Sequence, residues 1–259
     1  MQIRARDLGK TFYQNGHQRG RETQAYAGLD FDVAPGEFLC ILGPSGCGKT
    51  SLLRTLAGLE KPSSGELHIA PGEAAAPRVG MVFQEHGLFP WMTVRDNVRF
   101  LLEGDAQPGD LDGRVKQALA DVGLTDFAAY YPHQLSGGMC QRVSIARSFA
   151  GEPDILLMDE PFVFLDYQTR LALQALLLDL WRRQRSTVVF VTHDIEEAVL
   201  LADRILVLGP RPGYIRREIA VDIPRPRRVP ETTLEPHFRA LVAEVMDVLR
   251  VGEAVEPAP

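Results

Sequence analysis

The sequence predicts an α/β fold in which a mainly parallel sheet is flanked by helices and joined by an antiparallel β lobe and an inserted helical subdomain. Short apolar runs that each end in polar residues indicate the parallel sheet. A change from apolar strand runs to a helical periodicity over one internal stretch indicates the subdomain. A chain of 259 residues that is 45% hydrophobic can bury the core of such a domain.

The antiparallel lobe is expected at the start of the chain. A polar, glycine-bearing tract from Gln14 to Thr23 separates a strand near Ile3 from a second strand. In that second strand Leu29, Phe31 and Val33 alternate with other residues, which is typical of a strand with one buried face.

Four apolar runs have the length and continuous hydrophobicity of strands buried on both faces of a parallel sheet. They are Phe38–Leu42, Val79–Phe83, Ile155–Met158 and Val188–Val191, and Ile205–Leu208 is expected to add a further strand.

Polar residues follow each of these runs. The first run leads into a glycine-rich loop, the second into Gln84, the third into Asp159 and Glu160, and the fourth into Thr192 and His193. Because ligands of doubly wound sheets bind beyond the carboxyl ends of the strands, these residues are expected to converge.

The stretch from Trp91 to Glu152 predicts helices. Apolar residues share one helical face there, with Gly123 as the stop: Leu111, Val115, Ala118, Leu119 and Val122. Other helices are expected at Thr50–Ala57, Gln168–Arg183, Ile195–Ala202 and, after a proline- and arginine-rich stretch at 210–230, Pro236–Arg250. The final Ala/Pro/Glu tail is expected to be loose.

Charge and hydropathy exclude two classes of protein. A net charge of −6 and a pI of about 5.6 lack the basic footprint of a dedicated nucleic-acid binder. The first ten residues have no apolar signal region, and no stretch approaches the roughly 18 apolar residues of a membrane span. We therefore expect a soluble, cytosolic chain that binds no nucleic acid.

The three cysteines, Cys40, Cys47 and Cys140, are odd in number and fit no zinc-site spacing. We expect neither a disulfide nor a structural metal.

The segment GPSGCGKTS fits the P-loop pattern GxxxxGK followed by Ser or Thr, and predicts a P-loop NTPase core. Its candidate nucleotide-binding residues are Gly43, Pro44, Ser45, Gly46, Cys47, Gly48, Lys49, Thr50 and Ser51. Lys49 would neutralise β- and γ-phosphate charge, and the Thr50 hydroxyl would bind Mg²⁺. Cys47 is either a small packing residue or, near a helix N-terminus, a reactive thiol.

The segment ILLMDE places two adjacent carboxylates after a buried strand, where they are costly without a cation or water. Asp159 would hold Mg²⁺ through water, and Glu160 would act as general base toward the attacking water. The alternative is an acidic helix cap, although Asp166 is also available for capping.

The segment LSGGMCQR places Ser136, Gly137 and Gly138 at the start of a second helix, a second anion-binding helix end that ordinary P-loop enzymes do not need. With these motifs, the chain resembles the ATP-binding subunit of an ABC transporter over nearly all of its length.

The resemblance implies an ATPase that uses ATP and Mg²⁺. It implies an ABC ATPase domain at 1–230 with the helical subdomain inserted at about 90–152, and a C-terminal helix and tail at 231–259. It also implies a two-fold, head-to-tail dimer with a second copy of the chain, in which the Ser136 segment of one copy completes the P-loop site of the other.

Further site residues follow from the same resemblance. His193 matches the switch histidine that contacts the γ-phosphate, and Gln84 matches the glutamine that touches Mg²⁺ and water. Phe12, or alternatively Tyr13, matches the aromatic residue on which adenine stacks. Asp166 lies in the segment that matches the loop crossing the dimer interface at the nucleotide. Small residues are usual in that loop, and the bulky pair Val163–Phe164 departs from this pattern.

Two stretches resemble importers of nitrate, sulfonate, taurine and related anions: VFQEHGLFPWMTVRDNV and GPRPGYIRREIAVDIPRPR. The first implies a docking groove for an integral membrane permease, which would hold the chain at the cytoplasmic face of the inner membrane and link it indirectly to a solute-binding protein. Alternatively, Leu88–Trp91 is an apolar loop anchor and Arg225–Arg228 is a solvated tether.

The favoured function is an ATP-hydrolysing subunit that powers an importer of a small anion. The alternatives are a soluble, non-transport ABC ATPase or a slow-hydrolysing ATP-gated dimer switch. A P-loop kinase for a small molecule would leave the LSGGM segment and His193 unexplained.

Overall fold

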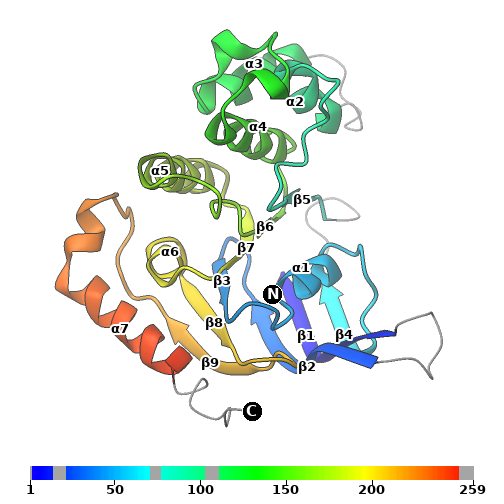
Figure 1. Cartoon of the computed structure of the whole chain (residues 1–259), viewed down its shortest axis with the longest axis vertical. Coiled ribbons are helices and arrows are strands. Elements are labelled where there is room, and N and C mark those ends of the chain that lie inside the picture. The colour runs from blue at the N-terminus through cyan, green and yellow to red at the C-terminus, as the bar shows by residue number, and fades with distance from the viewer. Residues whose placement is uncertain (1, 14–21, 71–76, 103–110, 251–259) are drawn as a thin grey trace. The chain divides into compact units, whose positions relative to one another are not determined.

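The computed structural model describes residues 2–13, 22–70, 77–102 and 111–250. The chain divides into two compact units, one formed by Met1–Ala76 with Thr187–Pro259 and the other by Pro77–Ser186. Each unit has its own sheet strands and helices (Figure 1).

The predicted antiparallel lobe is confirmed in the first unit. Strands β1 (Ile3–Tyr13), β2 (Glu22–Val33) and β4 (Ser64–Ile69) form a sheet in the order β2-β1-β4. Both neighbours run antiparallel to β1. The sequence did not predict β4, because its residues are mostly exposed and lack apolar alternation.

The first unit also holds strands in the order β7-β3-β8-β9, of which β7, β3 and β8 are parallel. Strand β3 (Phe38–Leu42) pairs in parallel with β7 (Thr187–Thr192) and β8 (Arg204–Leu208), and β9 (Ile215–Ala220) runs antiparallel to β8. Every residue of β3 and β7 is buried, which confirms the interpretation of their continuous apolar runs.

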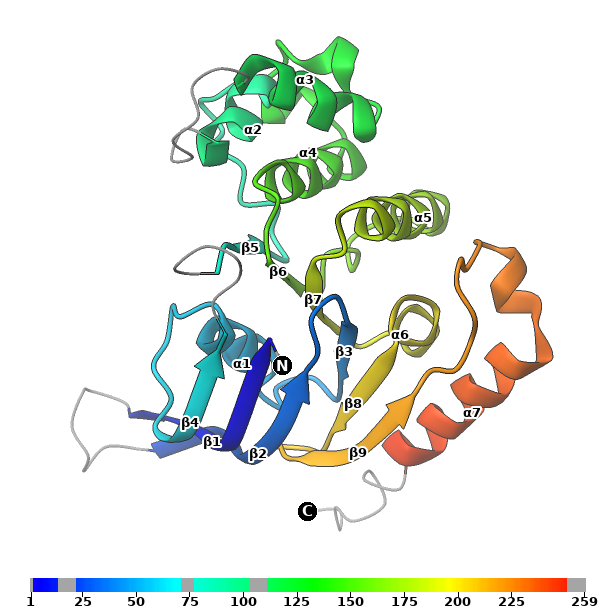
Figure 2. The same cartoon turned by 180° about the vertical axis from the view of Figure 1, so that it is seen from behind.

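Three α-helices belong to the first unit. They are α1 (Lys49–Leu56), α6 (Ile195–Leu201) and α7 (Pro236–Arg250), the last preceded by the 3-10 turn η5 (Glu231–Leu234). Helix α7 packs against α6, β8 and β9 (Figures 1 and 2) through Phe238, Leu241 and Val245, which share one buried face. The predicted helices are confirmed to within about two residues, and the C-terminal tail lies outside the described residues.

The second unit contains a parallel strand pair and a cluster of helices. Strand β5 (Val79–Val82) pairs with β6 (Ile155–Asp159), which leads to α5 (Tyr167–Gln184). Helices α2 (Val94–Leu102), α3 (Leu111–Asp121) and α4 (Gly137–Ala150) pack together (Figure 2), with 3-10 turns η3 (Thr125–Phe127) and η4 (Pro132–Gln134) between α3 and α4. The helical pattern predicted between Trp91 and Glu152 is therefore confirmed.

Among the helices of the described ranges, none combines the length and the apolar character needed to cross a membrane.

Candidate functional site

The P-loop segment connects β3 to α1 in the first unit. The backbone of Gly48, directly before α1, has φ +99°, a conformation that favours glycine. A Cβ atom at this position would lie 2.6 Å from the carbonyl oxygen of Ala25. Both the dihedral angle and the close approach of β2 therefore require glycine here.

Helix α1 begins without a side-chain cap. Gly48 at the N-cap has no side chain, and Lys49, Thr50 and Ser51 bring no acidic group to the first turn. The first N–H groups of a helix have no intrahelical acceptor, and the helix dipole makes this end positive. The start of α1 is therefore suited to bind an anion.

The ammonium group of Lys49 lies over the loop. The residue is buried, and its Nζ donates hydrogen bonds to the carbonyl oxygens of Gly43 at 2.8 Å and Pro44 at 3.0 Å. A positive side chain is thus held beside the positive end of a helix, and both attract negative charge to the same place.

His193 lies beside the P-loop on the neighbouring strand. Leu42 pairs with Thr192 in the parallel register of β3 and β7, so Gly43 and His193 are the next residues along at the same sheet edge. The His193 side chain is exposed. Asp194 then caps α6 by accepting a hydrogen bond from the Glu197 N–H at 3.1 Å. The structure thus brings His193 and the P-loop together within the first unit.

The acidic pair lies in the second unit, at the end of β6. Met158 pairs with Val82 of β5, so Asp159 and Glu160 continue beside Phe83 and Gln84. Asp159 is 4% exposed. Two carboxylates and the side-chain amide of Gln84 are thereby gathered at one sheet edge.

The backbone of Glu160 is in the left-handed region, with φ +42°. A residue with a side chain adopts this conformation only where the surrounding structure enforces it, and such residues cluster at functional sites.

Ser136 starts α4 in the second unit, as the LSGGMCQR segment predicted. Its Oγ accepts a hydrogen bond from the Met139 N–H at 3.3 Å, and Ser136 and Gly137 are exposed. Helix α5 approaches the same end closely, because a Cβ atom on Gly138 would lie 2.5 Å from Cγ2 of Thr169. Position 137 has open space around it, so only Gly138 is required by packing.

The loop after β6 has one buried aromatic residue, Phe162, and one exposed aromatic residue, Phe164. Phe164 is 72% exposed, whereas Leu165 is buried. Asp166 caps α5 by accepting a hydrogen bond from the Thr169 N–H at 3.0 Å. The hydrogen bond from the Thr169 side chain, followed by those from backbone amides, lowers the pKa of Asp166. Asp166, and not the Asp159–Glu160 pair, is therefore the helix cap.

The two candidate aromatic residues for adenine lie at the end of β1. Phe12 and Tyr13 are both about two-fifths exposed, at 38% and 41%. The Lys10 ammonium lies 4.9 Å from the centroid of the Phe12 ring, an attractive cation–π geometry.

Comparison with known proteins identifies the family. The family model for the ABC transporter matches residues 26–163. The nitrate import ATP-binding protein NrtD of Synechocystis sp. is 42% identical over 265 residues, covering 99% of this chain and 98% of that protein. The aliphatic sulfonates import ATP-binding protein SsuB 2 of Burkholderia cenocepacia is 48% identical over 224 residues, covering 86% of this chain and 80% of that protein. The chain belongs to the ABC transporter family.

Solved ABC structures agree with this assignment. The ATP-binding cassette MJ0796, in a dimeric post-hydrolysis state bound to ADP and Pi, matches with a TM-score of 0.73 at 31% identity, over 85% of this chain and 98% of that one. A second dimeric structure of MJ0796 matches with a TM-score of 0.72 at 32% identity. The predicted fold class, a P-loop NTPase core with a mainly parallel sheet, is therefore confirmed, and the chain is an ATP-binding ATPase of this family.

The cysteines of this ABC ATPase are buried. Cys47 is 1% exposed, and its Sγ lies 3.0 Å from where a Cβ on Gly43 would stand. This fits a small packing residue, because a reactive thiol has to be accessible. Burial also raises the pKa of the Cys40 and Cys140 thiols.

Sequence reasoning missed a polar stripe on α4 that holds the loop after Gln84. Gln141 Oε1 lies 2.6 Å from Nδ1 of His86, and Arg147 donates to the Gly87 carbonyl oxygen at 2.8 Å. Burial lowers the pKa of Arg147. The sequence did carry a signal, because Gln141, Ser144 and Arg147 are polar residues spaced three apart in a largely buried helix.

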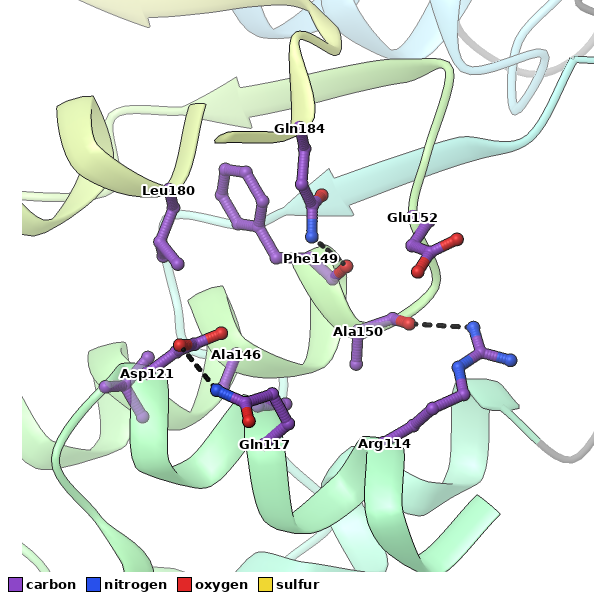
Figure 3. Close-up of a pocket in the computed structure, with 11 residues that line it drawn as sticks. Arg114, Gln117, Asp121, Ala146, Phe149, Ala150, Glu152, Leu180 and Gln184 are labelled. Carbon is purple, nitrogen blue, oxygen red and sulfur yellow. Dashed lines mark hydrogen bonds between the residues drawn. The ribbon is translucent and has the colours of Figure 1, made fainter. Parts of the chain in front are cut away.

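Figure 3 shows a pocket of about 110 Å³ in the second unit, among α3, α4 and α5. Arg114 donates to the Ala150 carbonyl oxygen at 3.0 Å, and Gln184 donates to that of Phe149 at 3.1 Å. None of the predicted site residues lines this pocket. This pocket is therefore separate from the candidate phosphate-binding segments described above.

The close approach of Gly138 and Thr169 gives a testable expectation. Gly138→Ala should lower the free energy of unfolding by about 1–3 kcal/mol, because the added methyl group overlaps Cγ2 of Thr169. Thr169→Ser removes that methyl group and keeps the hydroxyl, so the double variant should recover most of the loss. Urea unfolding measures both effects.

Gly137→Ala serves as the control, since an added Cβ there meets nothing within 4 Å. Equal destabilisation by both alanine substitutions, or no recovery in the double variant, would contradict the packing of α4 on α5.

Proposed function

We propose that this chain is the ATP-binding and ATP-hydrolysing subunit of an ABC importer for a small anion, and that it works as a head-to-tail dimer. The observation that carries the proposal is the side-by-side position of the P-loop and His193 at the ends of paired strands. The chain also has a second helix start, capped by Ser136, with no acidic residue in its first turn. Residues 1–230 would form the ATPase domain, with its helical subdomain at about 90–152, and 231–259 the C-terminal helix and tail.

Nucleotide binding is assigned to the P-loop. Within Gly43–Ser51, the backbone N–H groups of Gly46 to Thr50 would surround the phosphates, while Lys49 exchanges carbonyl oxygens for phosphate oxygens. Phe12 would stack on adenine, since its ring is accessible at the strand end.

The residues available for Mg²⁺ fit that ion. The Thr50 hydroxyl, the Asp159 carboxylate and the Gln84 amide oxygen are hard oxygen donors, which Mg²⁺ prefers and often contacts through water. Within the described ranges, no cluster of three or more His, Cys, Asp or Glu residues competes as a metal site. When bound, Mg²⁺ neutralises charge on the transferred phosphoryl group.

Hydrolysis is assigned to Glu160, His193 and Gln84. Glu160 would accept a proton from the attacking water, since it directly follows the buried Asp159 at the end of β6. His193 would contact the γ-phosphate and orient the water, and Gln84 would touch the water and Mg²⁺.

Dimerisation is assigned to the start of α4 and the loop before α5. Ser136 and Gly137 are exposed at a positive helix end, which favours an anion supplied by another copy. Asp166 and the exposed Phe164 would lie along the same interface. The dimeric MJ0796 structures support a two-copy arrangement.

The surface proposed to bind the membrane partner is aromatic and follows Gln84 in the chain. Phe89 packs on Trp91 at 5.5 Å and on Phe100 at 4.7 Å between ring centroids, and Trp91 is 70% exposed. Buried Asn97 fixes this loop. Its Oδ1 accepts a hydrogen bond from the Phe89 N–H, and its Nδ2 donates to the carbonyl oxygens of Phe89, Met92 and Thr93. An ordered, exposed aromatic surface is typical of a docking site.

The importer assignment also draws on the relatives named for nitrate and aliphatic sulfonate import. The permease would hold the chain at the cytoplasmic face of the membrane, and a solute-binding protein would act indirectly through it. A screen of nitrate, sulfonates and taurine with the reconstituted transporter tests the solute.

Glu160→Gln should keep ATP binding, lower turnover by about 10²–10⁴-fold because the general base is lost, and accumulate a nucleotide-bound dimer. Phosphate release and light-scattering mass measure these outcomes. Glu152→Gln is the matched control, because Glu152 is also a glutamate with a left-handed backbone in the second unit, at φ +46°. Unchanged turnover in Glu160→Gln would reject the general-base assignment.

Ser136→Arg should leave binding of one ATP per chain intact and block closure of the dimer, since a bulky cation replaces the helix cap at the interface. Equilibrium binding and crosslinking across the dimer test this, with Ser136→Thr as a control that keeps the hydroxyl cap. Normal closure of the arginine variant would show that this segment lies away from the interface.

Trp91→Ala should abolish co-purification with the permease while ATP affinity stays within about twofold of wild type, because central aromatic anchors dominate interfaces. Leu234→Ala is the control, as an equally exposed apolar residue of the first unit, 64% exposed. Retention of the permease by Trp91→Ala would move the docking surface elsewhere.

A further inference from the structure

The Arg225–Pro226–Arg227 segment is built into the first unit. Arg227 is 6% exposed, and Arg225 is about half-buried. The interpretation of this stretch as a solvated tether is therefore wrong for both residues and holds only for the exposed neighbour Arg228.

The two arginines bind the C-terminal end of α6. Nη1 of Arg227 donates to the carbonyl oxygens of Val199 at 3.2 Å, Leu200 at 3.0 Å and Ala202 at 2.6 Å. Nη2 of Arg225 donates to that of Leu201 at 2.7 Å. The last carbonyls of a helix have no intrahelical donor, and the dipole there favours a cation. Two guanidinium groups thus satisfy four consecutive carbonyls.

The other side of Arg227 holds the chain that follows β9. Its Nη2 donates to the carbonyl oxygens of Val221 at 3.3 Å and Ile223 at 3.0 Å. Burial, with a smaller effect of the Arg225 charge, lowers the pKa of Arg227 to about 10, so the group keeps its proton at neutral pH. One buried cation therefore fastens α6 to the edge of the sheet.

Arg225 extends the same contact network to the strand that leads to the P-loop. Its Nε donates to Oδ1 of Asp203 at 2.7 Å, and Oδ2 of Asp203 accepts from the Phe38 N–H at 2.9 Å. Phe38 is the first residue of β3. The base of β3 and the end of α6 are thus joined through two side chains.

Helix α6 carries this constraint toward His193. It has only seven residues, about 10 Å of helix, and Asp194 caps its first turn directly after His193. A short helix held at both ends moves as one body, so a shift at its C-terminal end displaces its first residue.

We infer that Arg225 and Arg227 are positioning residues for ATP hydrolysis, which set the place of His193 relative to the P-loop by fixing the C-terminal end of α6. The inference rests on the proposed function, because it needs His193 to act at the γ-phosphate. The arginines act through α6 and β3 and touch no nucleotide. Helix α7 packs against α6 (Figure 1). The contacts of Arg225 and Arg227 with the end of α6 are called the clamp below.

The test is the ATPase kinetics of Arg227→Lys, which keeps the charge but replaces the branched donor with a single ammonium group. Turnover should fall about tenfold, since small displacements of a catalytic group cost that much or more, while KM and the dissociation constant for ATP stay within about twofold. Arg228→Lys, the same change at the exposed neighbouring residue, should behave as wild type.

A second measurement separates positioning from general stability. In a His193→Ala background, adding Arg227→Lys should lower turnover by less than about a further twofold. The catalytic contribution of the His193 side chain, which Arg227 positions, is already lost in that background. An equal loss in both backgrounds, or a rise in KM that accounts for the whole effect, would overturn the inference. If Arg227→Lys does not fold, Arg225→Gln, which loses the Leu201 and Asp203 contacts, takes its place with the same expectations.

The outcomes also distinguish this inference from the proposed function. A large loss of turnover in His193→Ala together with wild-type kinetics in Arg227→Lys would overturn the clamp alone. Wild-type turnover in His193→Ala would overturn the proposed role of His193 and the clamp with it.

Discussion

The constraint on which the proposed site in the first unit depends is the placing of the Lys49 ammonium group beside the positive start of α1. Burying an ammonium group is costly unless it is bonded, and the Gly43 and Pro44 carbonyls supply those bonds. The tight approach of Ala25 to Gly48 then holds the loop in its left-handed backbone. The fold thus keeps a cation and the N-terminal end of α1 facing one point.

Parallel strand register does the remaining positioning. Because β3 and β7 end together, the P-loop and His193 lie side by side in the first unit. Because β5 and β6 end together, Gln84 and the acidic pair lie side by side in the second. Buried arginines then fasten a helix end and a loop by donating hydrogen bonds to backbone carbonyl oxygens. Arg227 does this for α6 in the first unit, and Arg147 does it for the loop after Gln84 in the second.

The sequence predicted the buried strands and the chemistry-bearing loops, because continuous apolar runs and glycine-rich anion motifs are local signals. It could not predict β4 or β9, whose mostly polar residues become strands only through pairing with a neighbour. It also missed the burial of Arg227 and Arg147, since an arginine enters a core only when distant backbone carbonyls satisfy it. For Cys47 the motif alone left two roles open, a small packing residue or a reactive thiol, and the burial of its side chain favours packing.

The most direct test of this account is a crystal structure with Mg²⁺ and a non-hydrolysable ATP analogue. The account predicts that Nζ of Lys49 contacts β- and γ-phosphate oxygens, with Glu160 and His193 on either side of the γ-phosphate. A triphosphate bound away from Gly43–Ser51, with Lys49 still bonded only to the carbonyls of Gly43 and Pro44, would contradict it.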